Sequence, residues 1–361
     1  MYNSSFKVDN TLVAIDQPSY FIADIAANHD GDIERAKNLI WLAKEAGADA
    51  AKFQHFKAED IVSAQGFAGL SEQLSHQSTW EKPVFDIYKQ YECSRTWNQE
   101  LIATCNEADI DFMTTPYDPE AVAMFANDVV AYKIGSGDIT WIENIINIAR
   151  VGKPVFLATG ASSMADVMRA VDAILSVNPN ICLMQCNTNY TGDDDNFKYI
   201  NLNVLRTYSE RYPNMLLGLS DHTPGHTTVL GAITLGARVI EKHFTDDQTL
   251  TGPDHGFSMT PKSWREMVDR SRELEASLGN GVKTIEQNEI DPAVVQRRCM
   301  RATRDLKAGE IITKQDMEAL RPAPTGYILP YESERIIGLR LTSDIAKGDG
   351  FPITMLEGED A

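Results

Sequence analysis

Two apolar segments near the middle of the chain each carry a histidine at or near their end. LLGLSDH (216–222) ends in His222, and RVIEKHF (238–244) has His243 as its second-last residue. Two neutral imidazoles, completed by water, suit a first-row divalent ion such as Mn²⁺ or Zn²⁺. The spacing alone leaves a second interpretation open, in which both rings form hydrogen bonds with loop backbone.

Two lysines lie in apolar segments of the same kind, Lys52 in AAKFQHF and Lys133 in AYKIGSG. A buried ammonium group loses several kcal/mol of hydration unless an anion compensates it. Together with the hydroxyl of Ser136, the lysines predict a site for a phosphate or a carboxylate. The alternative is that Asp24 or Asp138 pairs with them in purely structural ion pairs.

From residue 20 to about 282, short β-rich segments alternate with amphipathic helical patterns. The β-rich segments are 21–27, 50–56, 111–116, 131–137, 154–160, 181–187, 216–222 and 238–244. Near-continuous apolar strands that alternate with helices are typical of a parallel sheet covered by helices. Eight such units predict an α/β fold, a closed (β/α)₈ TIM barrel over residues 1–282.

The barrel prediction explains why apolar strands end in polar residues. Active sites of such barrels are formed at the carboxyl ends of the strands. The polar residues predicted at these ends include Asp24, Lys52, Gln54, Thr115, Lys133, Ser136, Asp138, Thr188, Ser220, His222 and His243. We therefore expect one site on this rim.

After residue 282 the pattern changes. Residues 283–295 are polar and suggest a linker. ATRDLKAGEIITKQDM and LTSDIAKGDGFPITML then resemble one another, with an acidic-apolar pair, a lysine, a glycine and a short β-rich run in each. This internal repeat predicts a small β-rich domain with two similar halves at 296–361.

The composition excludes several classes of protein. The net charge is −19 and no basic run occurs, which argues against nucleic acid as a partner. No segment is long and apolar enough to span a membrane, and the amino terminus lacks a signal-peptide core. The five cysteines are scattered, as in a reduced cytoplasmic protein.

The motifs ANHDG, GADAAKFQ, TTPYD, YKIGSGD, ATGASS, GLSDHT, IEKHFT and GPDHGFSM occur in this order along the chain. In content and spacing they resemble the N-acetylneuraminate (sialic acid) synthase family, which includes the pseudaminic and legionaminic acid synthases. The tail, with LRPAPTG, resembles that family's antifreeze-like (SAF) domain.

The resemblance implies an enzyme that condenses phosphoenolpyruvate with an N-acylated hexosamine aldehyde, such as N-acetylmannosamine, and releases phosphate. It implies that His222 and His243 bind a divalent metal, with Mn²⁺ preferred over Mg²⁺ or Co²⁺, and that Asp24 deprotonates the attacking water. The residues matched to phosphoenolpyruvate are Lys52, Thr115, Lys133, Ser136 and Ser220. Those matched to the sugar are Gln54, Asp138, Tyr190 and Asp254, and Thr188 is a further substrate-binding candidate. The family assembles as a domain-swapped homodimer, in which Arg321 would enter the barrel of the second subunit.

Several positions depart from the family pattern, among them Asp24 and Asp138, which stand where glutamate is usual. Catalysis is sensitive to displacements of about 1 Å, which is close to what the loss of one methylene produces. Two other functions stay open at this point. One is an aldolase or lyase that uses Lys52 or Lys133 as a Schiff-base amine, and the other is a sugar-acid binding protein without activity.

Overall fold

The computed structural model describes residues 2–70 and 75–356. The chain divides into two compact units, residues 1–279 and 280–361. The last five residues of the predicted carboxyl-terminal domain, 357–361, lie outside the described part.

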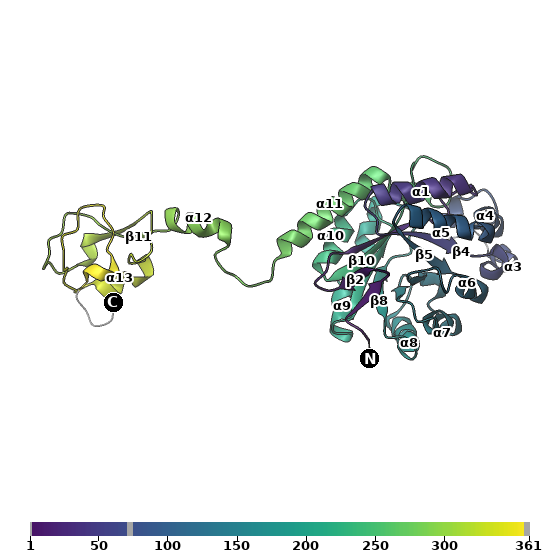
Figure 1. Ribbon diagram of the computed structural model, residues 1–361, viewed down its shortest axis with the longest axis horizontal. Coiled ribbons are helices and arrows are strands. Elements are labelled where there is room, and N and C mark those ends of the chain that lie inside the picture. The colour runs from purple at the N-terminus through teal and green to yellow at the C-terminus, as the bar shows by residue number, and fades with distance from the viewer. Residues whose placement is uncertain (1, 71–74, 357–361) are drawn as a thin grey trace. The chain divides into compact units, whose positions relative to one another are not determined.

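The first unit is a closed barrel of eight parallel strands, in the order β10-β3-β4-β5-β6-β7-β8-β9 (Figure 1). The strands are β3 (Tyr20–Asp24), β4 (Ala50–His55), β5 (Asp111–Pro116), β6 (Tyr132–Ile134), β7 (Val155–Ala158), β8 (Ile181–Cys186), β9 (Leu216–Asp221) and β10 (Ala237–His243). This confirms the predicted fold class. Each strand begins within a residue of the predicted segment, and most end one to three residues earlier.

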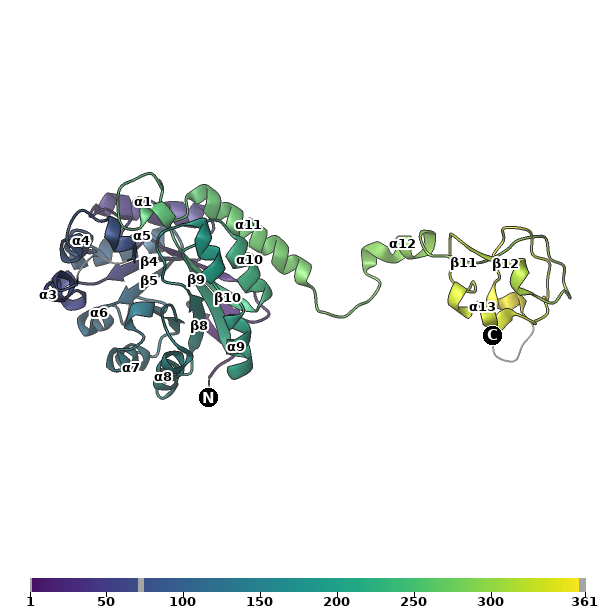
Figure 2. The ribbon, with the colours of Figure 1, turned by 180° about the vertical axis from the view of Figure 1, so that it is seen from behind.

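Helices surround the strands on the outside (Figure 1, Figure 2). They are α1 (Ile33–Glu45), α5 (Asn98–Glu107), α6 (Pro119–Met124), α7 (Ile142–Arg150), α8 (Met164–Leu175), α9 (Val204–Arg211), α10 (Thr227–Thr234) and α11 (Pro261–Leu278). The long β4–α5 connection adds the short helices α2 (Ala58–Ile61), α3 (Ala64–Ala68) and α4 (Val84–Gln90) and the 3₁₀ turn η1 (Ser75–Thr79). Within the described residues, no helix has the length and apolarity that a membrane crossing requires.

Side chains alternate between the two faces of each barrel strand. In β8, Ile181 and Leu183 pack in the large cluster between strands and helices, whereas Cys182 and Met184 pack inside the barrel. Gly218 of β9 is part of the inner packing, because a Cβ there would lie 2.7 Å from the Val239 carbonyl oxygen. The interior near the amino ends of the strands is therefore a packed core, and only its carboxyl end is polar.

An amino-terminal hairpin closes the end of the barrel at which the strands begin. We did not predict this hairpin from the sequence. It consists of β1 (Ser5–Val8) and β2 (Thr11–Ala14), which pair antiparallel. Phe6, Val8 and Val13 of the hairpin join the inner core of the barrel. Because this end is filled with apolar side chains, ligands can reach the barrel interior only from the carboxyl ends of the strands.

The second unit contains α12 (Ile290–Val295), β11 (Cys299–Ala302), β12 (Met317–Leu320) and α13 (Ser333–Ile336). Helix α12 lies in the segment that the sequence suggested as a linker. The two similar sequence segments pair with each other, since Leu306 and Ile345 form an isolated β-bridge. Their aspartates bond reciprocally: Lys347 N donates to Asp305 at 2.8 Å, and Ala308 N donates to Asp344 at 2.9 Å.

Candidate active site

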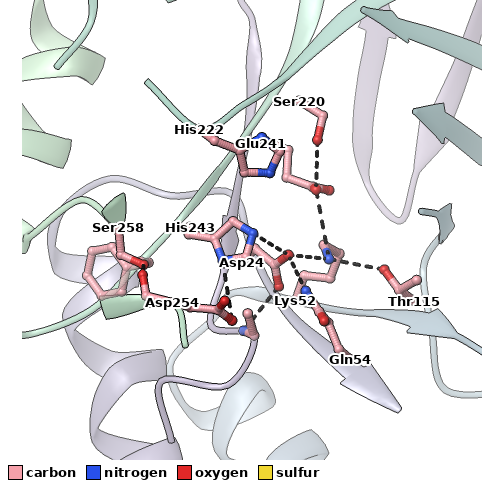
Figure 3. A network of polar contacts seen from close by, with 12 residues as sticks. Asp24, Lys52, Gln54, Thr115, Ser220, His222, Glu241, His243, Asp254 and Ser258 are labelled. Atoms are coloured by element: carbon pink, nitrogen blue, oxygen red, sulfur yellow. Dashed lines mark hydrogen bonds and ion pairs between the residues drawn. The ribbon is translucent and has the colours of Figure 1, made fainter. Parts of the chain in front are cut away.

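The strand register brings the predicted catalytic residues together at the carboxyl end of the barrel. Asp24 pairs with Lys52 of β4 on one side and with His243 of β10 on the other. Because side chains alternate, residues two apart share a face, so Lys52 and Gln54 both point inward. Figure 3 shows these side chains converging on Asp24.

Asp24 is the centre of a buried network. Its Oδ2 accepts hydrogen bonds from Lys52 Nζ at 2.7 Å and Gln54 Nε2 at 3.0 Å (Figure 3). Lys52 Nζ also donates to Thr115 Oγ1 at 3.0 Å. Burial alone would raise the pKa of Asp24, but the positive charge and hydrogen bond of Lys52 outweigh burial and lower it to about 2. Asp24 is therefore an ionised carboxylate held against a cation.

A second buried ion pair lies beside the first. Lys133 Nζ donates to Glu241 Oε1 at 2.8 Å, and Ser220 Oγ donates to the same oxygen at 3.3 Å. Burial would lower the pKa of Lys133, but Glu241 raises it above its usual value. Lys52 Nζ is 3.8 Å from this Glu241 oxygen, so the two pairs form one cluster.

This cluster can be compared with the two interpretations of Lys52 and Lys133, an anion-binding site or purely structural ion pairs. Both lysines are 4% exposed or less, and each has a carboxylate partner in this structure. Ion pairing with Asp24, named as an alternative, is present for Lys52. The pairs do not exclude an anion site, because an incoming phosphate can share or replace carboxylate contacts with the same two cations.

His222 and His243 also meet at this end of the barrel. Their ring centroids are 5.3 Å apart, and both rings are buried. Burial lowers the pKa of His222 to about 4 and that of His243 to about 3, so both imidazoles are neutral at neutral pH. His222 Nδ1 lies 2.8 Å from the Asn187 carbonyl oxygen, which fixes it as a donor and leaves Nε2 with a free lone pair.

The histidine pair fits a divalent metal. Both rings are neutral, and His243 Nδ1 is buried without a hydrogen-bond partner among the described residues. His243 lies between two carboxylates, with Nε2 3.7 Å from Asp24 and Nδ1 3.8 Å from Asp254 (Figure 3). In the described part of the chain, no group of three or more His, Cys, Asp or Glu side chains is already arranged to bind a metal ion. Water or substrate would have to supply the remaining ligands.

Ser136 and Thr188 come together around Gly160, next to Lys133. A Cβ on Gly160 would lie 2.5 Å from Thr188 Cγ2, 2.9 Å from Ser136 Oγ and 3.1 Å from Cys186 Sγ. Gly160 N donates to Ser136 Oγ at 2.8 Å. This wall of the site therefore requires glycine.

Tyr190 and Asp254 lie on the outer side of the histidines. The Tyr190 ring is 4.4 Å from that of His222. Asp254 Oδ2 accepts a hydrogen bond from Ala27 N at 3.1 Å. Burial raises the pKa of Asp254 to about 7, although the Ala27 N–H opposes this shift.

Two further residues were predicted to bind substrate, one in each unit. Burial raises the pKa of Asp138 to about 6, and its carboxylate makes no hydrogen bond to another described residue. Arg321 belongs to the second unit, where it follows β12 and is exposed.

Two residues of the site were missed in the sequence. Glu241 is two positions before His243 on β10 and so faces the same side, a signal that was available. Phe257, in the 3₁₀ turn η5 (His255–Phe257), packs 4.9 Å from the His243 ring. No periodic pattern marks Phe257, because it lies in a loop.

Two models of known protein families match this chain, one over most of the barrel and one over the carboxyl-terminal domain. The NeuB family model matches residues 39–283, and the SAF domain model matches residues 297–357. These matches confirm the resemblance that the motifs indicated, including the SAF domain at the carboxyl end.

Similar proteins span nearly the whole chain. An N,N'-diacetyllegionaminic acid synthase of Legionella pneumophila is 33% identical over 91% of this chain and 92% of its own. An N-acetylneuraminate-9-phosphate synthase of Homo sapiens is 29% identical over 92% of this chain and 91% of its own. A solved N-acetylneuraminic acid synthetase structure from Leptospira borgpetersenii aligns with a TM-score of 0.70 and 27% identity, over 80% of this chain and 94% of that one. The chain belongs to the NeuB family and carries a SAF domain at its carboxyl end.

Proposed function

We propose that this protein is a nonulosonic acid synthase that condenses phosphoenolpyruvate with an N-acylated amino sugar in its aldehyde form and releases phosphate. Membership of the NeuB family supports this activity. The observation that carries the proposal is the surroundings of Asp24, whose Oδ2 lies 2.7 Å from Lys52 Nζ and 3.7 Å from His243 Nε2. The carboxylate that would act as the base thus lies next to both a cation and an imidazole.

In this mechanism Lys52 and Lys133 bind the anionic groups of phosphoenolpyruvate, with hydroxyl donors from Thr115, Ser136 and Ser220. The electron pair of the phosphoenolpyruvate double bond forms a bond from its methylene carbon to the aldehyde carbon and leaves C2 as an oxocarbenium carbon. The aldehyde oxygen takes a proton from solvent and becomes a hydroxyl. Water then adds to the former C2 carbon of phosphoenolpyruvate and gives a proton to Asp24. Cleavage of the bond between C2 and the phosphate oxygen then releases phosphate, which takes the proton of the new C2 hydroxyl, and leaves a keto acid. The fixed lysine charges stabilise the phosphate as it leaves.

His222 and His243 are the residues that would bind a divalent metal, with Mn²⁺ the expected ion. When bound, such an ion polarises a carbonyl oxygen as a Lewis acid. Asp24 and Asp254 lie on either side of His243, at 3.7 Å from its Nε2 and 3.8 Å from its Nδ1. Tyr190 and Phe257 cover the two imidazoles and limit the access of water.

The Schiff-base alternative is less compatible with this site. An amine must be unprotonated to attack a carbonyl, whereas Glu241 raises the pKa of Lys133 above its usual value. Lys52 Nζ donates hydrogen bonds to Asp24 and Thr115. Both lysines are thus suited to bind anions as cations.

Phosphate release tests the proposal and both alternatives. We expect phosphate to form from phosphoenolpyruvate only when an N-acylated amino sugar and Mn²⁺ are both present, which can be followed by a colorimetric phosphate assay. Borohydride added during turnover is expected to leave the protein mass unchanged. A lysine adduct would support an aldolase, and binding without phosphate release would support the non-catalytic alternative.

The SAF domain is proposed to complete the site of a second subunit in a swapped homodimer, through Arg321. The support is the family pattern, together with the exposed position of Arg321 after β12. We place the enzyme in the cytoplasm, because its five cysteines are free.

Co-expression of two inactive variants tests the swapped arrangement. Arg321→Ala and His222→Ala subunits, each inactive alone, are expected to regain about half of the parent activity in mixed dimers. One site of such a dimer then has both residues intact, since the exchange is symmetric. Differently tagged subunits, purified through both tags and assayed for phosphate release, provide the measurement. Mixed dimers without activity would mean that Arg321 acts in its own chain or has no role.

A further inference from the structure

An ion pair lies behind the histidines, on the outer side of the barrel strands. Asp221 is the last residue of β9 and Lys242 the second-last residue of β10, and their paired side chains are each 1% exposed. Thr228 Oγ1 of α10 donates to Asp221 Oδ2 at 2.8 Å, which places the pair between the strands and that helix. Because side chains alternate along a strand, the pair faces away from the site and cannot touch a substrate there.

The ion pair connects the two chain segments that carry the histidines. Lys242, which immediately precedes His243, donates from Nζ to Asp221 Oδ2 and, at 2.5 Å, to the carbonyl oxygen of Thr223. Asp221 and Thr223 are the neighbours of His222 in the chain, so one ammonium group is bonded on both sides of that histidine. Thr223 Oγ1 also donates to Asp221 Oδ2 at 2.8 Å, across the turn that contains His222.

The backbone gives His222 less support than it gives His243. His243 lies within the β10–β3 ladder. The β9–β10 ladder ends at Asp221 and Lys242, and His222 is the first residue beyond β9. The bond between His222 Nδ1 and the Asn187 carbonyl oxygen joins this histidine to the loop after β8. The ion pair joins the same segment to β10, the strand that carries the other histidine.

The stability of the fold alone does not account for such a pair. Removing two charges from water costs about as much free energy as their attraction returns, and apolar residues of similar volume often replace a buried pair without loss of stability. A metal site, in contrast, requires its ligands within about 0.5 Å of the productive geometry. Groups that orient metal ligands typically change the metal affinity by about 10–100-fold.

We infer that the Asp221–Lys242 ion pair positions the metal site by setting the separation of His222 and His243, whose ring centroids are 5.3 Å apart. Asp221 and Lys242 are thus positioning residues, which act through the histidines. The inference rests on the proposed function, because it takes the two histidines to be the metal ligands. It assigns a role to the two charged residues that directly precede them in the chain.

Lys242→Met tests the pair from the side of β10. Methionine keeps most of the apolar volume but removes the ammonium group, which leaves the Asp221 carboxylate buried without its cation. We expect the thermal midpoint of the metal-free protein to fall by about 5–15 °C. The Kd for Mn²⁺ is expected to rise about 10–100-fold. Scanning calorimetry measures the first change, and the electron paramagnetic resonance signal of free Mn²⁺ during a titration measures the second.

The double variant Asp221→Asn/Lys242→Met separates positioning from stability. No unpaired charge remains, and the asparagine oxygen can still accept the hydroxyls of Thr223 and Thr228. The thermal midpoint is therefore expected to return to within about 5 °C of the parent value. The bonds from residue 242 stay broken, so the Kd for Mn²⁺ should remain about 10-fold or more above that of the parent. Recovery of Mn²⁺ affinity together with stability would show that the pair is merely structural and would overturn the inference.

Arg272→Met is the matched control, because it breaks an ion pair of the same unit away from the histidines. Arg272 of α11 lies 2.9 Å from Glu275 and donates to the Ser19 carbonyl oxygen at 2.9 Å, just before β3 begins. We expect a lower thermal midpoint but a Kd for Mn²⁺ within about twofold of the parent value, as for distant sites that do not interact. A rise in Kd equal to that of Lys242→Met would show that any loss of barrel stability weakens metal binding, which would overturn the inference.

Thr223→Val keeps the test decisive if neither Lys242 variant folds. It removes the hydroxyl that bonds to Asp221 and is expected to raise the Kd for Mn²⁺ by about two- to tenfold, as for one hydrogen bond. A parent protein that binds no Mn²⁺ would overturn the proposed metal site itself. Mn²⁺ binding by the parent, with the same Kd in the folded double variant or in Thr223→Val, would overturn this inference alone.

Discussion

Replacing either His222 or His243 by alanine is expected to lower phosphate release by about 10⁴-fold or more, the largest effect expected of any single change. The two neutral imidazoles lie together, with ring centroids 5.3 Å apart. Among the described residues, no group of three or more His, Cys, Asp or Glu side chains is arranged to bind a metal ion. The loss of one of two protein ligands removes most of the metal affinity. Mn²⁺ binding, followed by calorimetry and by the electron paramagnetic resonance signal of the free ion, should be lost together with turnover.

His226→Ala is the control for this pair. His226 lies four residues after His222 as the N-cap residue of α10, where its side chain makes no capping hydrogen bond. The change should leave both Mn²⁺ binding and turnover unchanged. Thermal unfolding should show that all three variants fold. Undiminished turnover or Mn²⁺ binding in a folded His222→Ala or His243→Ala protein would contradict the metal assignment.

The barrel could be predicted from the sequence because its strands are buried on both faces. Buried parallel strands appear as continuous apolar segments, and the helices between them keep their own spacing. The amino-terminal hairpin gave no comparable signal. Phe6, Val8 and Val13 alternate over only a few residues, and their partners, such as Tyr20 and Phe156, are distant in sequence. Only the closed barrel defines the surface that they fill.

The site could be predicted where it lies on strands, and less well where it lies on loops. The predicted strand residues Lys52, Lys133 and Ser220 converge because strand register and the two-residue alternation are local properties. Glu241 follows the same rule and could have been included. Trp80 and Phe257, which line a pocket beside the histidines, could not be predicted from the sequence. They lie in the β4–α5 connection and in a loop after β10, and these segments follow no periodic pattern.

The Asp24 carboxylate is expected to be nearly as important as the histidines, and the motif resemblance places it where glutamate is usual. Asp24→Asn keeps the shape but cannot accept a proton from water, so kcat for phosphate release should fall by about 10²–10⁴-fold. The KM for phosphoenolpyruvate should change much less, because Lys52 keeps its charge and its bond to Thr115. Asp111→Asn is the control, because Asp111 lies on β5 at the opposite end of the barrel, bonded to Tyr20. Steady-state kinetics of both variants, with their thermal midpoints, provide the measurement.

Asp24→Glu asks whether the site is adapted to the shorter acid. Oδ2 already lies 2.7 Å from Lys52, 3.0 Å from Gln54 and 3.7 Å from His243, and the residue is 2% exposed. An additional methylene would have to push the carboxylate into these neighbours, and inserting one into a packed site costs about 1–3 kcal/mol. We therefore expect kcat to fall about 10-fold, which is less than for Asp24→Asn because a base is retained. Activity equal to or above that of the parent would mean that the aspartate is a tolerated substitution in a site still shaped for glutamate.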